Sequence, residues 1–130
     1  MAAAVKSGAV IFAKDVGAVA RFYENAVPMT VLAEEDGAVR LENESLQLVI
    51  HALPKAVAKQ IEISVPPRLR ERSAIKPVFA VDSLDRVRGL VSALGGGMNP
   101  ASSTFVWAGF RACDGHDPEG NQIQFREAAE

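Results

Sequence analysis

The sequence predicts an α+β fold made of two βαβββ modules, whose curved mixed sheets surround a cleft for a ligand. The first observation behind this prediction is a repeated motif: residues 12–15 read Phe-Ala-Lys-Asp and residues 79–82 read Phe-Ala-Val-Asp. The second is that an apolar, strand-like run precedes each motif and an amphipathic, helix-like stretch follows it. The third is that further strand-like runs follow each helix-like stretch, which gives the order β-α-β-β-β twice.

Both amphipathic stretches have the periodicity of a helix with one buried face. Asp15 precedes the first stretch and Asp82 the second, and an aspartate in this position accepts hydrogen bonds from the N–H groups of the first turn. Glycine readily adopts the left-handed conformation found just after a helix, so the glycine run at 95–97 ends the second helix. The apolar stripes consist of Val16, Val19, Ala20, Tyr23 and Val27 in the first half and Leu84, Val87, Val91 and Leu94 in the second.

The remaining segments are predicted as strands and a connector. In the first half, strands at 29–33 and 38–41 flank an Asp-Gly hairpin signal, and a third strand covers 46–51. In the second half, strands are predicted at 98–101, 104–111 and 122–126. Module one thus covers about residues 7–53 and module two about 75–127. A proline-rich connector at 54–74 carries a short helix near 55–60 and a charged run at 68–72, which is a solvated face or, alternatively, a clamp for phosphate or carboxylate.

Length and composition fit a single domain spanning residues 1–130. A formal net charge of −2 gives no broad basic field for nucleic acid or for an anionic membrane, so small molecules and protein partners are the expected ligands. The single cysteine, Cys113, has no partner for an intramolecular disulfide, which fits a reducing compartment. Neither a leader-like segment nor an apolar run of about 18 residues is present, and we expect a cytoplasmic protein.

Two motifs resemble those of a known superfamily. Residues 117–124 read Asp-Pro-Glu-Gly-Asn-Gln-Ile-Gln, which is similar to the D-P-[DE]-G-N-x-[IL]-E signature of the glyoxalase/bleomycin-resistance/extradiol dioxygenase (vicinal oxygen chelate) superfamily. Asp15, followed by Phe22 and Tyr23, resembles the D-x(6)-F-Y pattern of its first helix. The resemblance covers about residues 7–127 and implies a glyoxalase-like fold and a homodimer. The turn at 117–121 also has a purely structural interpretation, so neither Asp117 nor Glu119 is treated as catalytic.

The resemblance also places the positions at which metal-using relatives hold a divalent ion. In this sequence they correspond to Gly8, with Ser7 and Ala9 beside it, and to Gln47, Lys76 and Gln124. An ion of this kind needs several converging nitrogen or oxygen ligands, and neutral amides replace carboxylates poorly without a supporting histidine. We therefore predict no metal and no other cofactor. This departure removes the basis for transferring glyoxalase, extradiol dioxygenase or metal-dependent thiol transferase activity to this chain.

Several polar residues are candidates for the lining of the cleft. Gln47 and Gln124 occupy matching positions in the two modules, where the resemblance implies inward-pointing side chains; polar strand residues facing solvent are the alternative. Strand alternation puts His51 on the same face as Gln47. His51 is therefore a candidate acid or base, although a structural histidine at the strand end is the other interpretation. His116 is expected to be exposed in its turn.

Aromatic and cationic side chains add to the candidate lining. Trp107 lies between Phe105 and Phe110, with Arg111 beside them, and an indole at the mouth of a cleft stacks well on a flat ligand. Packing in the core or at a dimer contact is the alternative. Lys76, at a former metal position, would attract an anionic ligand if it points inward, whereas a surface lysine is equally compatible with the sequence.

Two functions follow from these candidates. The first is a binding protein that holds a small flat or amphipathic molecule in a metal-free cleft, similar to bleomycin-resistance proteins. The alternative is a cofactor-independent isomerase, hydrolase or lyase that uses His51 as acid or base, and a metal-dependent lyase or dioxygenase is a distant third. The residues alone do not decide whether the chain is an enzyme. A homodimer is expected in either case, because two-fold contacts are the commonest oligomer symmetry.

Overall fold

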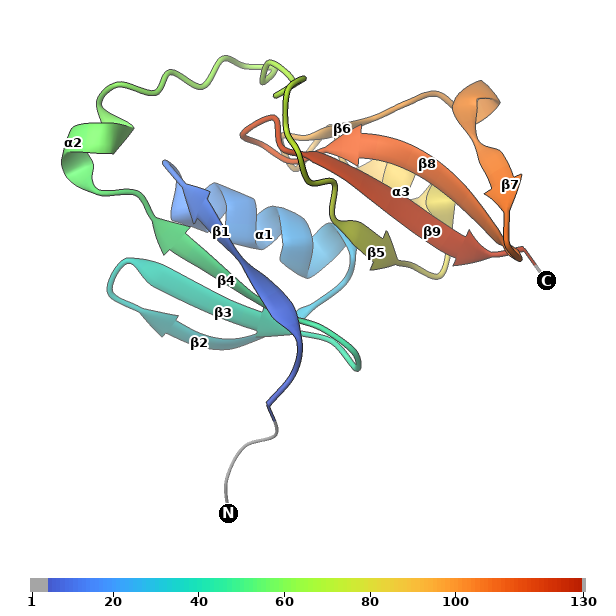
Figure 1. The fold of residues 1–130 in the computed structure, drawn as a ribbon, viewed down its shortest axis with the longest axis horizontal. Helices are drawn as coiled ribbons and strands as arrows, with labels where there is room; N and C mark the ends of the chain where they lie inside the picture. The colour runs from blue at the N-terminus through green and yellow to red at the C-terminus, as the bar shows by residue number, and fades with distance from the viewer. Residues whose placement is uncertain (1–4, 130) are drawn as a thin grey trace.

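The computed structural model describes residues 5–129 and contains two sheets (Figure 1). The first sheet has the strand order β1-β4-β3-β2. Strands β1 and β4 run parallel and pair Gly8 with Gln47 and Phe12 with His51, whereas the other neighbours are antiparallel. A parallel pair needs a crossover, which α1 supplies. The elements are β1 (Gly8–Ala13), α1 (Val16–Ala26), β2 (Thr30–Glu35), β3 (Ala38–Glu42) and β4 (Gln47–Ala52).

The second sheet repeats this plan. Its order is β5-β9-β8-β6, β5 runs parallel to β9, and β7 adds a short hairpin onto β8. The predicted α+β class with two βαβββ modules is therefore confirmed. The elements are β5 (Val78–Ala80), α3 (Leu84–Leu90), β6 (Gly97–Met98), the 3-10 turn Ala101–Ser103, β7 (Phe105–Trp107), β8 (Phe110–His116) and β9 (Gln122–Ala128).

The predicted strand at 104–111 is wrong in its extent. Ala108 and Gly109 both have positive φ angles, of 50° and 84°, so the chain reverses there in a hairpin between β7 and β8. Alanine rarely adopts this conformation, and the sequence carried no two-residue turn signal that would reveal it. Strand β8 then continues to His116, into the segment that was assigned to a turn.

The helices begin close to where the sequence predicts. Asp15 caps α1, because its Oδ1 accepts a hydrogen bond from the Ala18 N–H at 3.0 Å. The cap of α3 is Ser83 rather than Asp82, since the Ser83 hydroxyl accepts from the Arg86 N–H at 3.1 Å. The connector contains the expected short helix, α2 (Lys55–Ala58), and then runs as an extended strap towards β5 (Figure 1).

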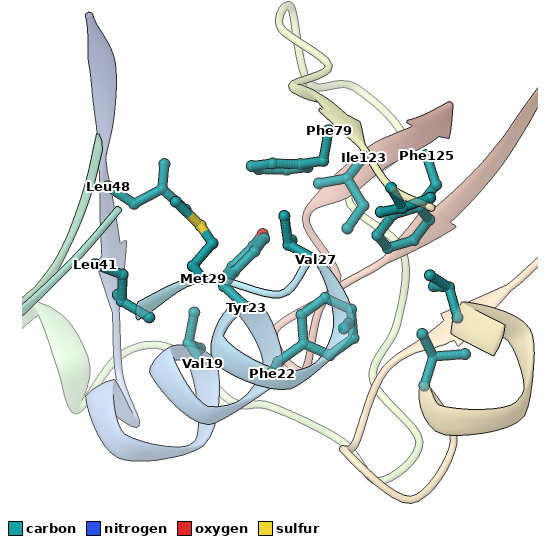
Figure 2. Packing of buried hydrophobic residues seen from close by; sticks show 14 of the residues in the cluster. Val19, Phe22, Tyr23, Val27, Met29, Leu41, Leu48, Phe79, Ile123 and Phe125 are labelled. Carbon is teal, nitrogen blue, oxygen red and sulfur yellow. The ribbon is translucent and has the colours of Figure 1, made fainter. Parts of the chain in front are cut away.

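One hydrophobic core joins the two modules, with α1 lying between the sheets (Figure 2). The Tyr23 ring is in contact distance of Phe22 on its own helix and of Phe79 on β5, with centroids 5.2 Å apart in each pair. Packing against this core covers one face of each sheet. Buried side chains come from the first sheet (Leu41, Leu48, Ile50), from α1 (Val19, Phe22, Tyr23) and from the second sheet (Phe79, Ile123, Phe125).

The other face of each sheet carries the residues that alternate with the core residues. We call these surfaces the first open face and the second open face. Residues with a large exposed fraction include Phe12 on the first open face and Trp107 on the second. None of the helices in the part of the chain that the structure describes has the length and apolar character needed to cross a membrane. The first open face includes Val10, Phe12, Arg40, Gln47, Val49 and His51, and the second includes Lys76, Phe110, Asp114, His116, Gln124 and Arg126.

Candidate functional site

A connected group of polar side chains crosses the second open face, and we call it the Lys76–Arg126 cluster. Lys76 Nζ donates a hydrogen bond to Asp114 Oδ2 at 2.8 Å. The other carboxylate oxygen, Asp114 Oδ1, accepts from Gln124 Nε2 at 3.0 Å. Gln124 Oε1 in turn accepts from Arg126 Nε at 2.6 Å. Four side chains from three neighbouring strand segments are thus held in one chain of hydrogen bonds.

The strand register explains why these residues meet. Asp114 on β8 pairs directly with Gln124 on β9, and cross-strand partners project from the same face of a sheet. Arg126 follows two residues later on β9 and therefore lies on that face as well. Lys76 lies in the segment just before β5, on the side of β9 that is opposite β8. The Pro77 carbonyl accepts the Gln124 N–H at 2.9 Å and fixes this segment alongside β9.

The electrostatics of the cluster are dominated by its cations. Burial alone would raise the pKa of Asp114, but hydrogen bonds from Lys76 and Gln124, together with the Lys76 charge, outweigh burial and hold this pKa below its usual range. Asp114 is therefore a carboxylate at neutral pH. With Lys76 and Arg126 charged and Gln124 neutral, the cluster carries a net positive charge.

Aromatic side chains continue the surface beyond Arg126. The Arg126 guanidinium carbon lies 4.2 Å from the centroid of the Phe110 ring, which is cation–π distance. Trp107 meets Phe110 edge-to-face, with centroids 5.5 Å apart, and 62% of Trp107 is exposed. The hairpin turn at Ala108 and Gly109 brings the two rings together across β7 and β8. An indole face thus remains accessible beside a positively charged group.

His116 also belongs to the second open face, two residues beyond Asp114 on β8. Its ring lies against Gly97 of β6, where a Cβ atom would come within 2.4 Å of the imidazole. Burial lowers the pKa of His116, and the nearby Asp117 charge only partly offsets this effect. His116 is consequently neutral at physiological pH. The sequence placed this residue in an exposed turn, whereas the structure places it, half-buried, at the end of β8.

The predicted site residues fall into three groups. Lys76 and Gln124 meet through Asp114, and Trp107 is linked to them through Phe110. Arg111 does not join this cluster: it alternates with Phe110 on β8 and lies towards Glu127, with Nη1 3.8 Å from the carboxylate. The third group, Gln47 and His51, lies on the first open face.

Within one chain, Gln47 and His51 are separate from the Lys76–Arg126 cluster, because α1 and the core lie between the two sheets (Figure 1). His51 Nδ1 is 2.7 Å from the carbonyl oxygen of Ala52, and its ring packs edge-to-face on Phe12 at 5.7 Å. Gln47 and His51 are four residues apart on one strand, which is about 13 Å. Gln47 is therefore beyond hydrogen-bond reach of His51, and Gln124 lies on the other sheet.

The residues at the former metal positions do not fit a divalent ion. Gly8 and Gln47 are neighbours in the β1–β4 register, and Lys76 and Gln124 are neighbours beside β5 and β9. Gly8 has no side chain, and both oxygens of Asp114 are already engaged by Lys76 and Gln124. A lysine ammonium thus occupies the second pair's position and repels a metal cation. Across residues 5–129, no three His, Cys, Asp or Glu side chains converge as a metal site.

The Asp-Pro-Glu-Gly-Asn turn joins the modules and holds the end of β8 to α1. Asp117 is fully buried and accepts hydrogen bonds from the Tyr23 hydroxyl at 2.8 Å and from the backbone N–H and the side-chain Nδ2 of Asn121. Glu119, also buried, accepts the N–H groups of Lys14 and Asp15 at 2.9 and 2.7 Å, just before α1. All these partners belong to the fold, which supports the structural interpretation of this turn.

The largest cavities do not coincide with the Lys76–Arg126 cluster. One of about 460 Å³ lies beneath the connector, between the start of α1 and the turn after α3, with Arg21, Ser64 and Leu94 in its lining. Volume alone favours the region beneath the connector, where a second cavity also measures about 460 Å³, whereas converging charged groups, a perturbed carboxyl group and an exposed indole favour the second open face. The acids in the first cavity's lining, Asp15 and Glu119, already accept backbone N–H groups, which makes the second open face the better candidate.

Two members of the cluster were not singled out from the sequence. Strand alternation places Arg126 on the same face as Gln124, so the sequence contained the information needed to predict it. Asp114 depends on the β8–β9 register, which the long turn between these strands does not reveal.

Comparisons with known proteins were made at the levels of sequence and structure. No family model matches the sequence, and no curated protein matches it either. Solved structures do match. A glyoxalase/bleomycin resistance protein from Albidiferax ferrireducens superposes with a TM-score of 0.65 at 16% identity, over 93% of this chain and 96% of that chain. The chain has the glyoxalase/bleomycin-resistance fold.

Two further structures with this glyoxalase-like fold are similar over nearly their whole length. The fosfomycin resistance protein FosX from Mesorhizobium loti gives a TM-score of 0.64 at 15% identity, covering 99% of this chain and 95% of that chain. The bleomycin resistance determinant encoded on transposon Tn5 gives 0.60 at 16% identity, covering 98% of this chain and 100% of that chain. These likenesses agree with the resemblance to the vicinal oxygen chelate superfamily and establish the fold, while the ligand has to be argued from the residues themselves.

Proposed function

We propose that this chain is a small-molecule binding protein, which holds a flat or amphipathic ligand in a metal-independent cleft on the second open face. The observation that carries this proposal is the exposed indole of Trp107 beside Phe110, next to the positively charged Lys76–Arg126 cluster. An aromatic surface with a few converging polar groups is typical of sites that bind small organic molecules. Bleomycin resistance proteins with this fold support the same interpretation by analogy.

We further propose that the cleft is completed in a homodimer. The first open face exposes Val10 and Phe12, each 54% exposed, and the second exposes Trp107 and Phe105. Exposed apolar patches of this kind are common at protein interfaces. A two-fold dimer that brings the first open face of one protomer over the second open face of its partner would cover both patches and enclose the ligand. The single, buried Cys113 fits a reducing compartment, and we propose the cytoplasm.

An acid/base role for His51 receives little support within one chain. His51 lies on the first sheet, and the charged groups that would bind a substrate lie on the second. A general base has to be within hydrogen-bond reach of the proton that it removes. Within one protomer the geometry therefore supports binding best, and an acid/base role would require the partner's His51 across the proposed dimer.

A ligand panel tests the binding function directly. Protein treated with EDTA is mixed with flat and amphipathic compounds, and the melting temperature and Trp107 fluorescence are recorded. A true ligand at a hundred times its Kd stabilises the protein by about 2.7 kcal/mol. We expect at least one compound class to raise the melting temperature and change the fluorescence equally with and without EDTA. No stabilisation across the panel, or stabilisation that EDTA abolishes, would contradict the proposal.

Light scattering tests the dimer. We expect the mass of two chains at micromolar concentration. Phe12→Lys, on the first open face, should shift the protein towards monomer. Val65→Lys is the matched control, because Val65 is 97% exposed but lies on the connector. A monomeric wild-type protein, or equal effects of the two variants, would contradict this arrangement.

A further inference from the structure

We propose that the ligand of the second open face carries a planar anionic group, of the carboxylate type, attached to a flat apolar ring system. Lys76 and Arg126 hold the anion, and the surface of Phe110 and Trp107 holds the ring. This inference rests on the proposed binding function and specifies the class of ligand.

The hydrogen-bond inventory of the cluster is the first argument. Both oxygens of Asp114 accept from protein donors, and both polar atoms of Gln124 are engaged. The donors are in excess. A lysine ammonium has three N–H bonds and a guanidinium has five, whereas among the described residues Lys76 and Arg126 each donate one side-chain hydrogen bond. Each oxygen of the cluster can accept a second hydrogen bond, but the unused donor positions of Lys76 and Arg126 outnumber the unused acceptor positions, which favours a ligand rich in acceptors.

Charge gives the second argument and points the same way. Lys76 and Arg126 contribute two positive charges, and Asp114 contributes one negative charge. The Asp114 charge is already paired with Lys76, so the net charge that the cluster presents to a ligand is positive. An anion compensates the remaining positive charge, whereas a cation would add to it.

The orientation of Arg126 suggests a planar anion. Its Nε atom is fixed by Gln124, and its guanidinium lies 4.2 Å from the centroid of the Phe110 ring. These two contacts orient the guanidinium and leave the pair of Nη atoms for the ligand. Two parallel N–H donors match the two oxygens of a carboxylate. The same stacking places the anion next to the Phe110–Trp107 surface, where an attached ring would pack on the exposed indole.

Three matched probes test the inference by equilibrium dialysis at up to millimolar concentration: 2-naphthoate, its neutral analogue 2-naphthamide, and 2-naphthyl phosphate. We expect 2-naphthoate to bind at least about ten-fold more tightly than 2-naphthamide, as the loss of a charge-assisted hydrogen bond implies. We expect the phosphate to bind no more tightly than the carboxylate, because the Nη pair of Arg126 engages two oxygens of either group and the phosphate brings a further oxygen that must lose water. Equal affinity for the carboxylate and the amide would overturn the claim that the ligand is anionic. Tighter binding of the phosphate would overturn the claim that its anionic group is planar.

Variants identify the residues responsible. Arg126→Gln should lower the affinity for 2-naphthoate towards that for 2-naphthamide, with Lys76 keeping part of the preference, and Arg126→Lys, which keeps the charge but lacks the planar fork, should retain an intermediate affinity. Arg111→Gln is the matched control, because Arg111 lies on the opposite face of the same sheet. Melting curves establish that each variant is folded, and Lys76→Met provides a second site variant. Equal losses in Arg111→Gln and Arg126→Gln would overturn the inference.

The outcomes separate the two proposals. Equal binding of 2-naphthoate and 2-naphthamide, both with an effect on Trp107 fluorescence, leaves a binding site without anion selectivity and removes only the further inference. Failure of all three probes to bind, together with no stabilisation in the wider ligand panel, removes both.

Discussion

Replacing Tyr23 by phenylalanine tests whether the buried Tyr23–Asp117 contact holds the two modules together. The Tyr23 hydroxyl donates to Asp117 Oδ2 at 2.8 Å, and both residues are fully buried. Burial raises the pKa of Tyr23, and the Asp117 charge adds to this effect, so the phenol stays protonated and donates. Phe keeps the ring that packs on Phe22 and Phe79. Only the hydrogen bond is lost.

The magnitude follows from what remains on Asp117. Its carboxylate keeps hydrogen bonds from the Glu119 N–H at 2.9 Å and from Asn121 N and Nδ2 at 3.1 and 2.8 Å. Losing one hydrogen bond to a buried charged group costs ~2 kcal/mol. For a chain of this length, that corresponds to a fall of ~7 °C in melting temperature.

Urea denaturation measures this change, and a double-mutant cycle isolates the contact. Tyr23→Phe should lower the urea midpoint without changing the slope m. Combined with Asp117→Asn, its effect should be clearly smaller than on the wild-type background, because the two residues share one interaction. Asn25→Ala, which removes an exposed hydrogen bond on α1, is the control and should cost less than ~0.5 kcal/mol. A Tyr23→Phe effect as small as this control would refute the reasoning.

Further predictions concern a turn and a titrating group. Gly120→Ala should lower the free energy of unfolding in urea by more than ~2 kcal/mol, because φ is +81° and a Cβ would lie 2.0 Å from the Arg68 carbonyl oxygen. Gly109→Ala is the control, with φ +84° and open space around it, and should cost only ~1 kcal/mol. Equal costs of the two substitutions would contradict this prediction. The lowered pKa of His116 means that the unfolded chain binds a proton first, so stability should fall as the pH drops below ~6.5. Melting curves between pH 7.5 and 5.5 should show a weaker pH dependence in His116→Asn, and an unchanged dependence would contradict the assignment. The pKa of Asp114 is lowered, so its carboxylate should stabilise the fold above pH ~4 and lose this effect as the pH falls further. NMR titration of the Asp114 carboxyl carbon can follow the protonation itself.

The parts of the fold that depend on local sequence were predictable. Asp15 as a helix cap, the apolar stripe containing Tyr23, and the turn around Gly120 all follow from interactions within a few residues. The α3 cap was displaced by one residue because Asp82 and Ser83 are both good caps and the sequence does not rank them. The hairpin at Ala108 was missed because alanine does not signal a positive φ angle.

The site was predictable only in part, for a different reason. Lys76 and Gln124 were found because matching positions in the two modules drew attention to them, but their link, Asp114, depends on the register between β8 and β9. Arg111 was grouped with Trp107 because the two are close in sequence. The hairpin and strand alternation place Phe110, rather than Arg111, beside the indole. The arrangement of the two open faces across the proposed dimer would be a property of the assembly, which local sequence patterns do not encode.

The most direct test of the account is a map of ligand contacts in solution. Amide and indole N–H shifts of EDTA-treated protein are recorded by NMR during titration with 2-naphthoate. We predict that the largest shifts occur at Trp107, Gln124 and Arg126 on the second open face. Shifts confined to the cavity beneath the connector, around Arg21 and Ser64, would contradict the assignment of the binding site to this face.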